Sequence, residues 1–143
     1  MSEVMAMEGV VEVEVYEILL DESVKAPVVV LREKNGDRIL PIWIGQAEAI
    51  SIAYAMEEIG TERPLTHDLI KLIIDGFGAK LDKVVINDLR DNTYFARLIF
   101  KMDSTIISID ARPSDSIAIA LRTKSPIYVS EKVLKEGGAT AEQ

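Results

Sequence analysis

The stretch STIISIDARPSDSIAIAL, residues 104–121, joins a predicted strand to a predicted helix and decides the fold class. Residues 105–110 are rich in isoleucine and threonine, whose β-branched side chains favour strands. Pro113 is tolerated at the first position of a helix, because the N–H that it lacks would have no partner there. We therefore predict a strand over residues 105–110 and a helix over residues 113–124.

The chain before this stretch alternates strand-like and helix-like blocks. Valines alternate with glutamates over residues 11–15, the period of a strand with one solvated face, and the phase slips near Tyr16 and Glu17 as at a β-bulge. Asn35 and Gly36 suit the positive φ angles of a tight hairpin turn. Strands are predicted over residues 10–20, 26–33, 38–44, 81–90, 93–102 and 105–110, with a short last strand in SPIYVS, residues 125–130.

Two further helices are predicted, over residues 46–59 and 66–77. Gly60 supplies a stop for the first helix, and Thr66 supplies an N-cap for the second. Most of the first helix is apolar around one narrow polar stripe, so we expect it to be buried on more than one side. The stripe consists of Glu48, Ser51, Ala55 and Glu58, and the plain interpretation of Glu48 is a solvated face.

Hairpins and a meander interrupted by three main helices indicate an α+β fold with a mostly antiparallel or mixed sheet. A short helix follows the last strand and decays into a glycine-rich end. The 143 residues fit one domain, which is large enough to bury well over half of its unfolded surface. We assign residues 1–137 to this domain and residues 138–143 to a flexible C-terminal tail.

The composition excludes several classes of function. Sixteen basic and 24 acidic residues give a net charge of −8, so the summed field repels polyanions and any phosphate ligand has to be met locally. The absence of cysteine excludes disulfides, thiolate metal sites and cysteine nucleophiles. HExxH, Walker, GxSxG and GxGxxG motifs are also absent, which removes the usual support for protease, nucleoside triphosphatase, hydrolase and dinucleotide-binding functions.

The sequence also predicts location and assembly. The N-terminus lacks the basic start and apolar core of a signal peptide, and no run approaches the roughly 18 apolar residues of a membrane span, so we expect a cytoplasmic protein with no membrane partner. Few amide side chains and no cysteine are a bias shared with thermophilic proteins. We expect a homodimer, because the helix over 46–59 and the run IAIAL, residues 117–121, offer more apolar surface than one small domain covers.

Polar side chains gather at the starts of two predicted helices, in RPLTHDL, residues 63–69, and DARPSDS, residues 110–116. A helix N-terminus presents unpaired N–H groups and about half a positive charge, so it stabilises anions. A purely structural alternative stays open. In that alternative the same side chains are helix caps (Thr66, Ser114), partners of the helix dipole (Asp68, Asp115) or one half of an ion pair (Arg112).

Three other side chains allow both a chemical and a structural interpretation. Asp110 ends an apolar strand near Asp115, where two carboxylates can share a proton or hold a hard cation such as Mg²⁺ or Mn²⁺. His67 is the only histidine, so an imidazole base has to be this one, the alternative being a surface histidine near solvent with no special role. Trp43 offers a face for a nucleobase, but its isoleucine neighbours favour a place in the core.

Three blocks carry a resemblance: RILPIWIGQAEAISIAYAMEEIGTERPLTHDL, VVINDLRDNTYFARLIF and DARPSDSIAIALRTKSPIYVSEKVL. Together they resemble the bifunctional nuclease domain family, over about residues 8 to 137. The resemblance implies a compact α+β domain, often oligomeric, with plant members associated with cleavage of both DNA and RNA. The site candidates that it implies are the polar residues of the shared blocks: Glu48, Arg63, Thr66, His67, Asp68, Asp88, Asp110, Arg112, Ser114 and Asp115.

Two functions from different classes fit these residues. The first is a nuclease dependent on Mg²⁺ or Mn²⁺, with Asp110 and Asp115 on the metal, His67 or Asp68 transferring a proton, and Arg63, Arg112 and Ser114 on the substrate. The second is a non-catalytic oligomeric module that binds a small anionic ligand or a protein partner through the same helix starts. Carboxylates converging in an open cleft favour the enzyme, whereas carboxylates each paired to an arginine favour the module.

Overall fold

One mixed sheet of eight strands runs through the part of the chain that the structure describes, residues 9–140. The structure is a computed structural model. In chain order the strands are β1 (Val10–Asp21), β2 (Ala26–Glu33), β3 (Arg38–Trp43), β4 (Lys80–Arg90), β5 (Thr93–Met102), β6 (Thr105–Ala111), β7 (Ile127–Ser130) and β8 (Ala139–Thr140). Across the sheet the order is β6-β5-β4-β7-β1-β2-β3-β8. All of these pairings are antiparallel except β4 with β7, which confirms the predicted α+β class and the largely antiparallel sheet.

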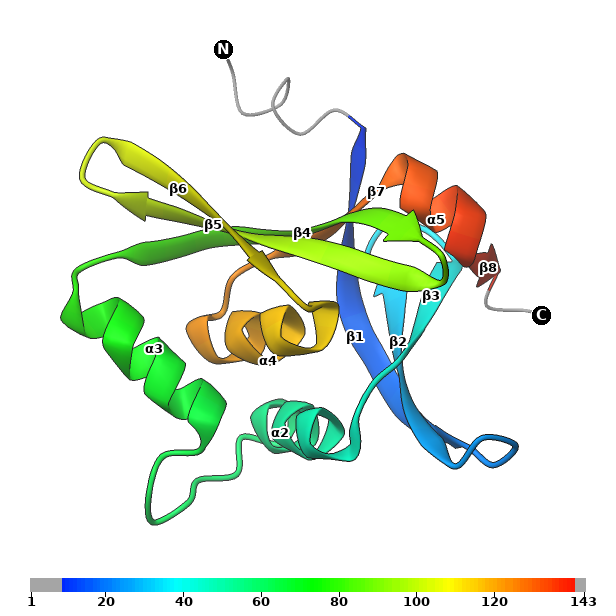
Figure 1. Ribbon diagram of the computed structural model, residues 1–143, viewed down its shortest axis with the longest axis horizontal. Coiled ribbons are helices and arrows are strands. Elements are labelled where there is room, and N and C mark those ends of the chain that lie inside the picture. Colours follow the sequence, from blue (N-terminus) through cyan, green and yellow to red (C-terminus); the bar gives the residue numbers. More distant parts are fainter. Residues whose placement is uncertain (1–8, 141–143) are drawn as a thin grey trace.

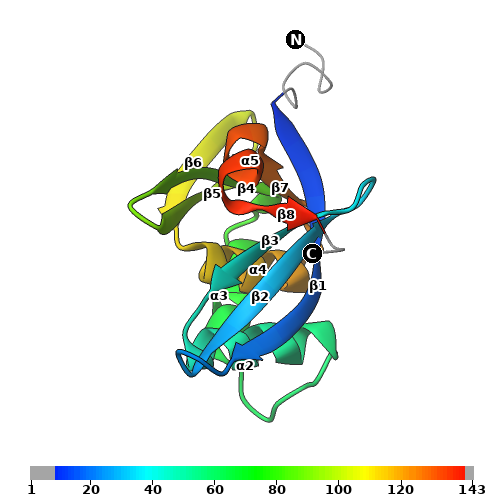
Figure 2. The same cartoon turned by 90° about the vertical axis from the view of Figure 1, so that its right-hand side faces the viewer.

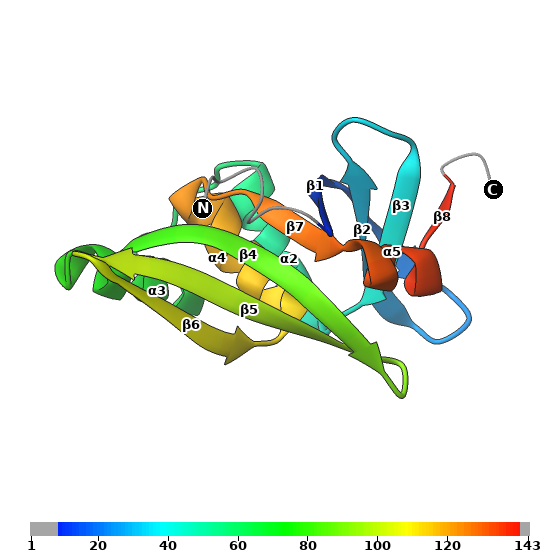
Figure 3. The ribbon, with the colours of Figure 1, turned by 90° about the horizontal axis from the view of Figure 1, so that it is seen from above.

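Four helices accompany this sheet: α2 (Gln46–Met56), α3 (Thr66–Gly76), α4 (Pro113–Thr123) and α5 (Glu131–Gly137). Strands β4, β5 and β6 cross the direction of β1, β2 and β3 steeply, and α4 lies in the corner between these two halves (Figures 1 and 3). Helices α2 and α3 both pack on α4, whereas α5 lies near β3 and β8 at the other end of the molecule (Figures 1 and 2). The structure thus adds α5 to the three main helices expected, at the place of the predicted short helix.

Helix α4 is the centre of the core. Residues 117–120 are at most 2% exposed, because α2 and α3 cover one side of the helix and strands β4 and β5 cover another. Residues 117–120 of the run IAIAL are therefore covered within one chain and Leu121 is partly buried, which removes most of the run from the argument for a homodimer. On α2 only Ala49, Ser51 and Ile52 are buried, while Ile50 is 57% exposed. Within one chain α2 is therefore not buried on more than one side, and its exposed side keeps the homodimer a prediction.

Local signals placed the elements well and some turns poorly. The pairing of β1 with β2 shifts register between Val15 and Glu17, which confirms the predicted bulge. Asn35 and Gly36 lack the positive φ angles expected of them, because a loop of four residues, 34–37, joins β2 to β3 and does not need a two-residue turn. Positive φ angles occur instead at Asp91 and Asn92, in the two-residue turn between β4 and β5.

Helix α2 ends three residues earlier than predicted. It stops at Met56 with Glu57 as its C-cap, because Glu58 already adopts a left-handed φ of 52°. Gly60 is therefore not its stop signal. The bounds of α3 and α4 lie within one residue of the predicted 66–77 and 113–124.

The end of the chain is only partly described. Ala139 and Thr140, which belong to the expected flexible tail, pair with Ile39 and Arg38 as strand β8. The remaining residues of that tail, 141–143, lie outside the described residues. Over residues 9–140, every helix is too short or too polar to span a membrane.

Candidate functional site

Side chains from α2, α3 and α4 form one chain of hydrogen bonds where these helices meet. Ser51 Oγ lies 2.6 Å from His67 Nδ1, and His67 Nε2 lies 2.8 Å from Asp115 Oδ1. The other carboxylate oxygen, Asp115 Oδ2, accepts from Arg112 Nε at 2.9 Å and lies 2.8 Å from a terminal Arg112 nitrogen. Ser51 and His67 are each 7% exposed, whereas the Arg112 side chain is 67% exposed. The chain of contacts thus runs from the interior to the surface.

A cavity of about 410 Å³ lies beside these hydrogen-bonded side chains and is called the His67 cavity below. Its polar lining comes from the first turn and the middle of α2 and from the starts of α3 and α4, and its apolar lining is made by three short or branched side chains. The lining residues are Glu48, Ser51, Thr66, His67, Arg112 and Asp115, together with Ala47, Ile50 and Leu65. A volume of this size is typical of small-molecule sites.

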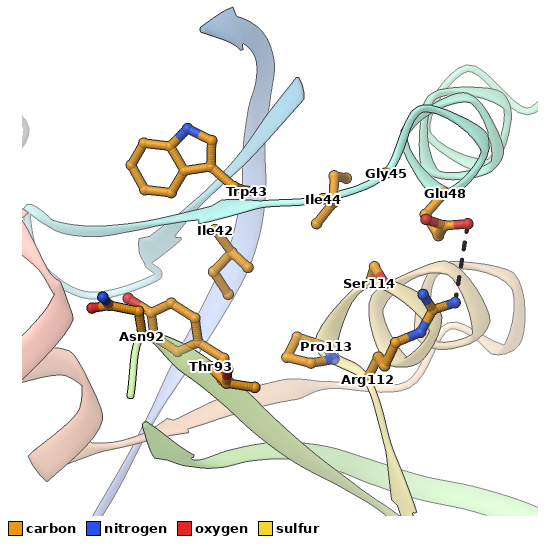
Figure 4. Close-up of a pocket in the computed structure, with 11 residues that line it drawn as sticks. Ile42, Trp43, Ile44, Gly45, Glu48, Asn92, Thr93, Arg112, Pro113 and Ser114 are labelled. Atoms are coloured by element: carbon orange, nitrogen blue, oxygen red, sulfur yellow. Dashed lines mark ion pairs between the residues drawn. The ribbon is translucent and has the colours of Figure 1, made fainter. Parts of the chain in front are cut away.

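A second cavity, of about 390 Å³, shares two lining residues with the first and is shown in Figure 4. Glu48 and Arg112 line both cavities, and their side chains approach within 4.0 Å, so this ion pair stands between the two. Ser114 and Tyr94 belong to the second cavity only. Ser114, which we expected near the substrate, therefore lines the second cavity and not the His67 cavity.

The hydrogen bonds define which ring nitrogen of His67 holds a proton. An ionised Asp115 has only acceptor atoms, so it accepts from an N–H at His67 Nε2. In the neutral ring His67 Nδ1 then carries a lone pair, which accepts the Ser51 hydroxyl proton. Asp115 also raises the pKa of the Arg112 guanidinium through hydrogen bonding and charge, so Arg112 stays cationic.

A second set of contacts holds the segments that carry Ser51 and His67. Arg122, in the last turn of α4, donates through Nε to Asp68 Oδ1 at 2.5 Å and through a terminal nitrogen to the Ser51 carbonyl at 3.2 Å. Asp68 Oδ2 accepts from the Leu65 N–H at 2.9 Å, just before α3 begins. The hydrogen bond from Arg122 is the main reason why the pKa of Asp68 is lowered. Arg122 therefore ties α2 and the start of α3 to α4.

The structure brings together only part of the predicted site. His67, Arg112 and Asp115 are in contact, and Thr66 and Glu48 line the same cavity. The remaining candidates have other surroundings. Arg63 is exposed in the loop before α3, Asp88 pairs with Arg90 at 3.0 Å, Asp68 pairs with Arg122, and Asp110 is 72% exposed on β6 at 4.0 Å from Arg97.

Several structural expectations were wrong. His67 is buried, because α2 and α4 cover the ring, and not a surface residue near solvent. Thr66 and Ser114 do not cap α3 and α4, since Leu65 and Arg112 occupy the N-cap positions. Trp43 is 52% exposed, not in the core, and its Nε1 donates to Asp21 at 2.8 Å. The predicted pairing of Arg112 with an aspartate is confirmed for Asp115.

The donor atoms do not fit a divalent ion held by Asp110 and Asp115. Both Asp115 oxygens already face N–H donors, and the Asp110 carboxylate points toward Arg97 instead. Within residues 9–140 no three acidic or histidine side chains converge as metal ligands. Hard cations need several oxygen ligands, and these two carboxylates do not supply them together. A dependence on Mg²⁺ or Mn²⁺ stays a prediction for the assay below.

Two residues of the site were missed from the sequence. Ser51 lies on the polar stripe of its helix, and a single hydroxyl there gives no sign of a buried histidine partner. Arg122 lies in the last turn of its helix, where a cation is expected to interact with the helix dipole alone. The one signal in the sequence was a cation directly after the apolar run of residues 117–121. An arginine buried there needs an acceptor, which the structure supplies as Asp68.

Comparison with known proteins relates the chain to one family. It matches the bifunctional nuclease domain over residues 29–142. An uncharacterised protein of Mycobacterium tuberculosis is 50% identical over 127 residues, 89% of this chain and 76% of that protein. Bifunctional nuclease 2 of Oryza sativa subsp. japonica is 32% identical (83% of this chain, 38% of the nuclease), and bifunctional nuclease 1 of Arabidopsis thaliana is 30% identical (78% and 36%). The chain thus spans little more than a third of these plant proteins.

Proposed function

Because the chain belongs to the bifunctional nuclease domain family, we propose that it hydrolyses phosphodiester bonds of DNA or RNA in the His67 cavity. The observation that carries the proposal is the placement of His67 between Ser51 and Asp115 at the wall of that cavity. A histidine held in one tautomer by a carboxylate is suited to general acid and base catalysis. The names of the plant relatives supply the class of reaction.

Each side chain then has a role that follows from its surroundings. Arg112 is cationic and largely exposed, so it meets the phosphate through charge-assisted hydrogen bonds. Asp115 orients the His67 ring and the Arg112 guanidinium at the same time, one with each oxygen. His67 Nδ1, which faces Ser51, is the ring atom that can accept and return a proton. The net charge of −8 confines attraction for the phosphate to this arginine and its neighbouring helix starts.

A second candidate is the non-catalytic module that binds a small anion. One observation favours it: each of the four predicted aspartates has an arginine partner, Arg112 for Asp115, Arg122 for Asp68, Arg97 for Asp110 and Arg90 for Asp88. This is the arrangement that we expected of the module. Both candidates place the anion at Arg112, and they differ in whether His67 transfers a proton.

The test is cleavage of single-stranded and duplex DNA and RNA by purified protein, with EDTA, Mg²⁺ or Mn²⁺. His67→Gln keeps a polar group in the buried position but removes the imidazole, so we expect the cleavage rate to fall by about 10²- to 10⁴-fold. Substrate binding, measured by fluorescence anisotropy, should change little. Circular dichroism and the unfolding midpoint show whether the variant is folded.

Asp110→Asn distinguishes the His67 cavity from the aspartate pair of the sequence-based hypothesis. It should keep most of the activity if catalysis is at the His67 cavity, and lose its metal-dependent activity if Asp110 holds an ion. Binding of oligonucleotide or inorganic phosphate without cleavage under any of these conditions would instead support the module.

A further inference from the structure

Ser51 carries a buried hydroxyl that the acid and base chemistry of His67 does not require. We propose that Ser51 is the nucleophile of this site and that the phosphodiester is cleaved through a covalent phosphoseryl intermediate. The inference rests on the proposed function for its substrate class. It turns a histidine with two partners into an ordered set of nucleophile, base and orienting carboxylate.

The contacts have the order and distances of such a set. Ser51 Oγ is 2.6 Å from His67 Nδ1 and Asp115 Oδ1 is 2.8 Å from His67 Nε2, within the hydrogen-bond reach expected of a nucleophile and its base. The two ring nitrogens have exchanged roles relative to the serine protease arrangement, which is recognised by geometry and roles and not by sequence position. The same proton transfer is available from either nitrogen.

The direction of the Ser51 hydroxyl is unusual for a serine within a helix. Such hydroxyls commonly donate to the carbonyl four residues earlier. In α4, Ser116 does so to the Arg112 carbonyl at 2.8 Å, and Thr123 does so to the Ile119 carbonyl at 3.1 Å. Ser51 contacts the imidazole of another helix instead. Its hydroxyl is thus directed at a base.

The surroundings hold this geometry in place. Arg122 binds the Ser51 carbonyl and the Asp68 carboxylate, and Asp68 binds the N–H of Leu65, two residues before His67. The nucleophile and the base are therefore fixed through their backbones as well as through their side chains. Such support from neighbouring residues is what keeps reacting groups within tenths of an ångström of a productive distance.

The His67 cavity gives the phosphorus a place within reach of both groups. Ser51, His67 and Arg112 line it together, so a phosphate bound to Arg112 lies in the same cavity as the hydroxyl. Ala47, Ile50 and Leu65 supply the apolar part of the lining and reduce competition from water. The exposed Arg112 marks the open side, from which a nucleic acid strand reaches the buried serine.

The steps balance without a cofactor. Ser51 Oγ bonds to phosphorus while its proton passes to His67 Nδ1, and the bond from phosphorus to the leaving alkoxide breaks as that oxygen takes the proton. Water then bonds to phosphorus and gives one proton to His67 Nδ1, and the bond between phosphorus and Ser51 Oγ breaks as the serine takes that proton back. Throughout, Asp115 stays bound to the N–H at Nε2. The net reaction converts a phosphodiester and water into a phosphomonoester and an alcohol.

The first experiment is labelling with diisopropyl fluorophosphate, followed by intact mass and peptide mapping. In wild-type protein we expect one adduct per chain, on Ser51, and in Ser51→Ala we expect none. In His67→Gln the labelling rate should fall at least about 10²-fold. Ser125→Ala is the matched control, because its hydroxyl donates to the Leu81 carbonyl at 2.8 Å and does not line the His67 cavity. Absence of an adduct on Ser51 in folded wild-type protein overturns the proposal.

A second variant removes the dependence on Ser51→Ala folding. The chain has no cysteine, so Ser51→Cys creates a unique thiol. Beside the His67 base this thiol should be alkylated by iodoacetamide at neutral pH at least tenfold faster than after the further change His67→Gln. Equal rates in the two folded variants contradict the assignment of His67 as its base.

Quenched reactions with ³²P-labelled oligonucleotide separate this inference from the proposed function. Radiolabel bound to wild-type protein and absent from Ser51→Ala supports the phosphoseryl intermediate. If wild-type protein cleaves the oligonucleotide and folded Ser51→Ala cleaves it equally fast, the proposed function stands and the inference fails. If Ser51 reacts with the fluorophosphate but no nucleic acid is cleaved, the proposed function fails and the phosphodiester step is overturned with it.

Discussion

Arg122→Met should lower the stability of the fold more than the loss of any exposed ion pair, because Arg122 links three helices. The Arg122 side chain is 7% exposed and donates to Asp68 and to the carbonyls of Ser51 and Ala118. A hydrogen bond to a charged group contributes about 1.5–3 kcal/mol and a neutral one about 0.5–1.5 kcal/mol. Methionine replaces much of the apolar stem, and Asp68, 36% exposed, is partly rehydrated. We therefore expect a loss of about 3 kcal/mol.

The assay is equilibrium unfolding in urea, followed by circular dichroism and by the fluorescence of Trp43, the only tryptophan. Lys71→Met is the control, because Lys71 forms an exposed pair with Asp75 at 2.8 Å on α3. That change should cost no more than about 0.5 kcal/mol. A loss below about 1 kcal/mol for Arg122→Met, in a variant with an unchanged denaturant slope, would refute the reasoning.

The same variant has an expected pH dependence. Arg122 holds the pKa of Asp68 below its usual value, so the ionised carboxylate is favoured in the folded protein. A depressed pKa contributes stability above the unfolded value of about 3.9, and that stability is lost as pH falls through the lower folded pKa. The difference in free energy of unfolding between wild type and Arg122→Met should be at its full value near pH 6 and should decrease below about pH 4. A difference that stays constant to pH 3 contradicts the role given to Asp68.

Two further predictions concern the rest of the fold. Arg38→Met leaves Glu33 and Glu131 without their shared partner, at 2.8 and 2.7 Å in the wild type, and should cost about 2–3 kcal/mol in urea unfolding. Arg38 lowers the pKa of both glutamates, so this cost should be full above about pH 5 and shrink in acid; equal costs at pH 7 and pH 3.5 would argue against it. The homodimer predicts twice the mass of one chain by light scattering at micromolar protein, and a single-chain mass would contradict it.

Elements were predictable from the sequence because their signals are local. The alternation of valine and glutamate in β1 and the proline that begins α4 each act within a few residues, and the structure has both elements where they were predicted. The turn at Asn35 and Gly36 shows where a local signal is insufficient. The loop there spans four residues, so the positive φ angles that a two-residue turn requires of this pair are not needed.

The site was less predictable, because its defining contacts are tertiary. His67 and Ser51 are 16 residues apart, and His67 and Asp115 are 48 residues apart. Periodicity placed Ser51 on the polar side of α2, but it could not indicate that α3 would bring a histidine to this side. The spacing of Asp110 and Asp115 crosses the boundary between β6 and α4, where neither the strand nor the helix period fixes the relative direction of two side chains.

The electrostatics of the His67 cavity indicate which contact gives way to a substrate. Arg112 is opposed by two carboxylates, Asp115 at 2.8 Å and Glu48 at 4.0 Å, so with a neutral His67 these groups carry no net positive charge. A phosphate bound at Arg112, as proposed above, competes with both carboxylates for the charge of the guanidinium. The longer Glu48 contact is weaker and lies between the two cavities, whereas the shorter Asp115 contact also orients His67. For the proposed reaction, loss of the Glu48 contact would leave the hydrogen bonds among Ser51, His67 and Asp115 intact, as the proposed catalysis at His67 requires.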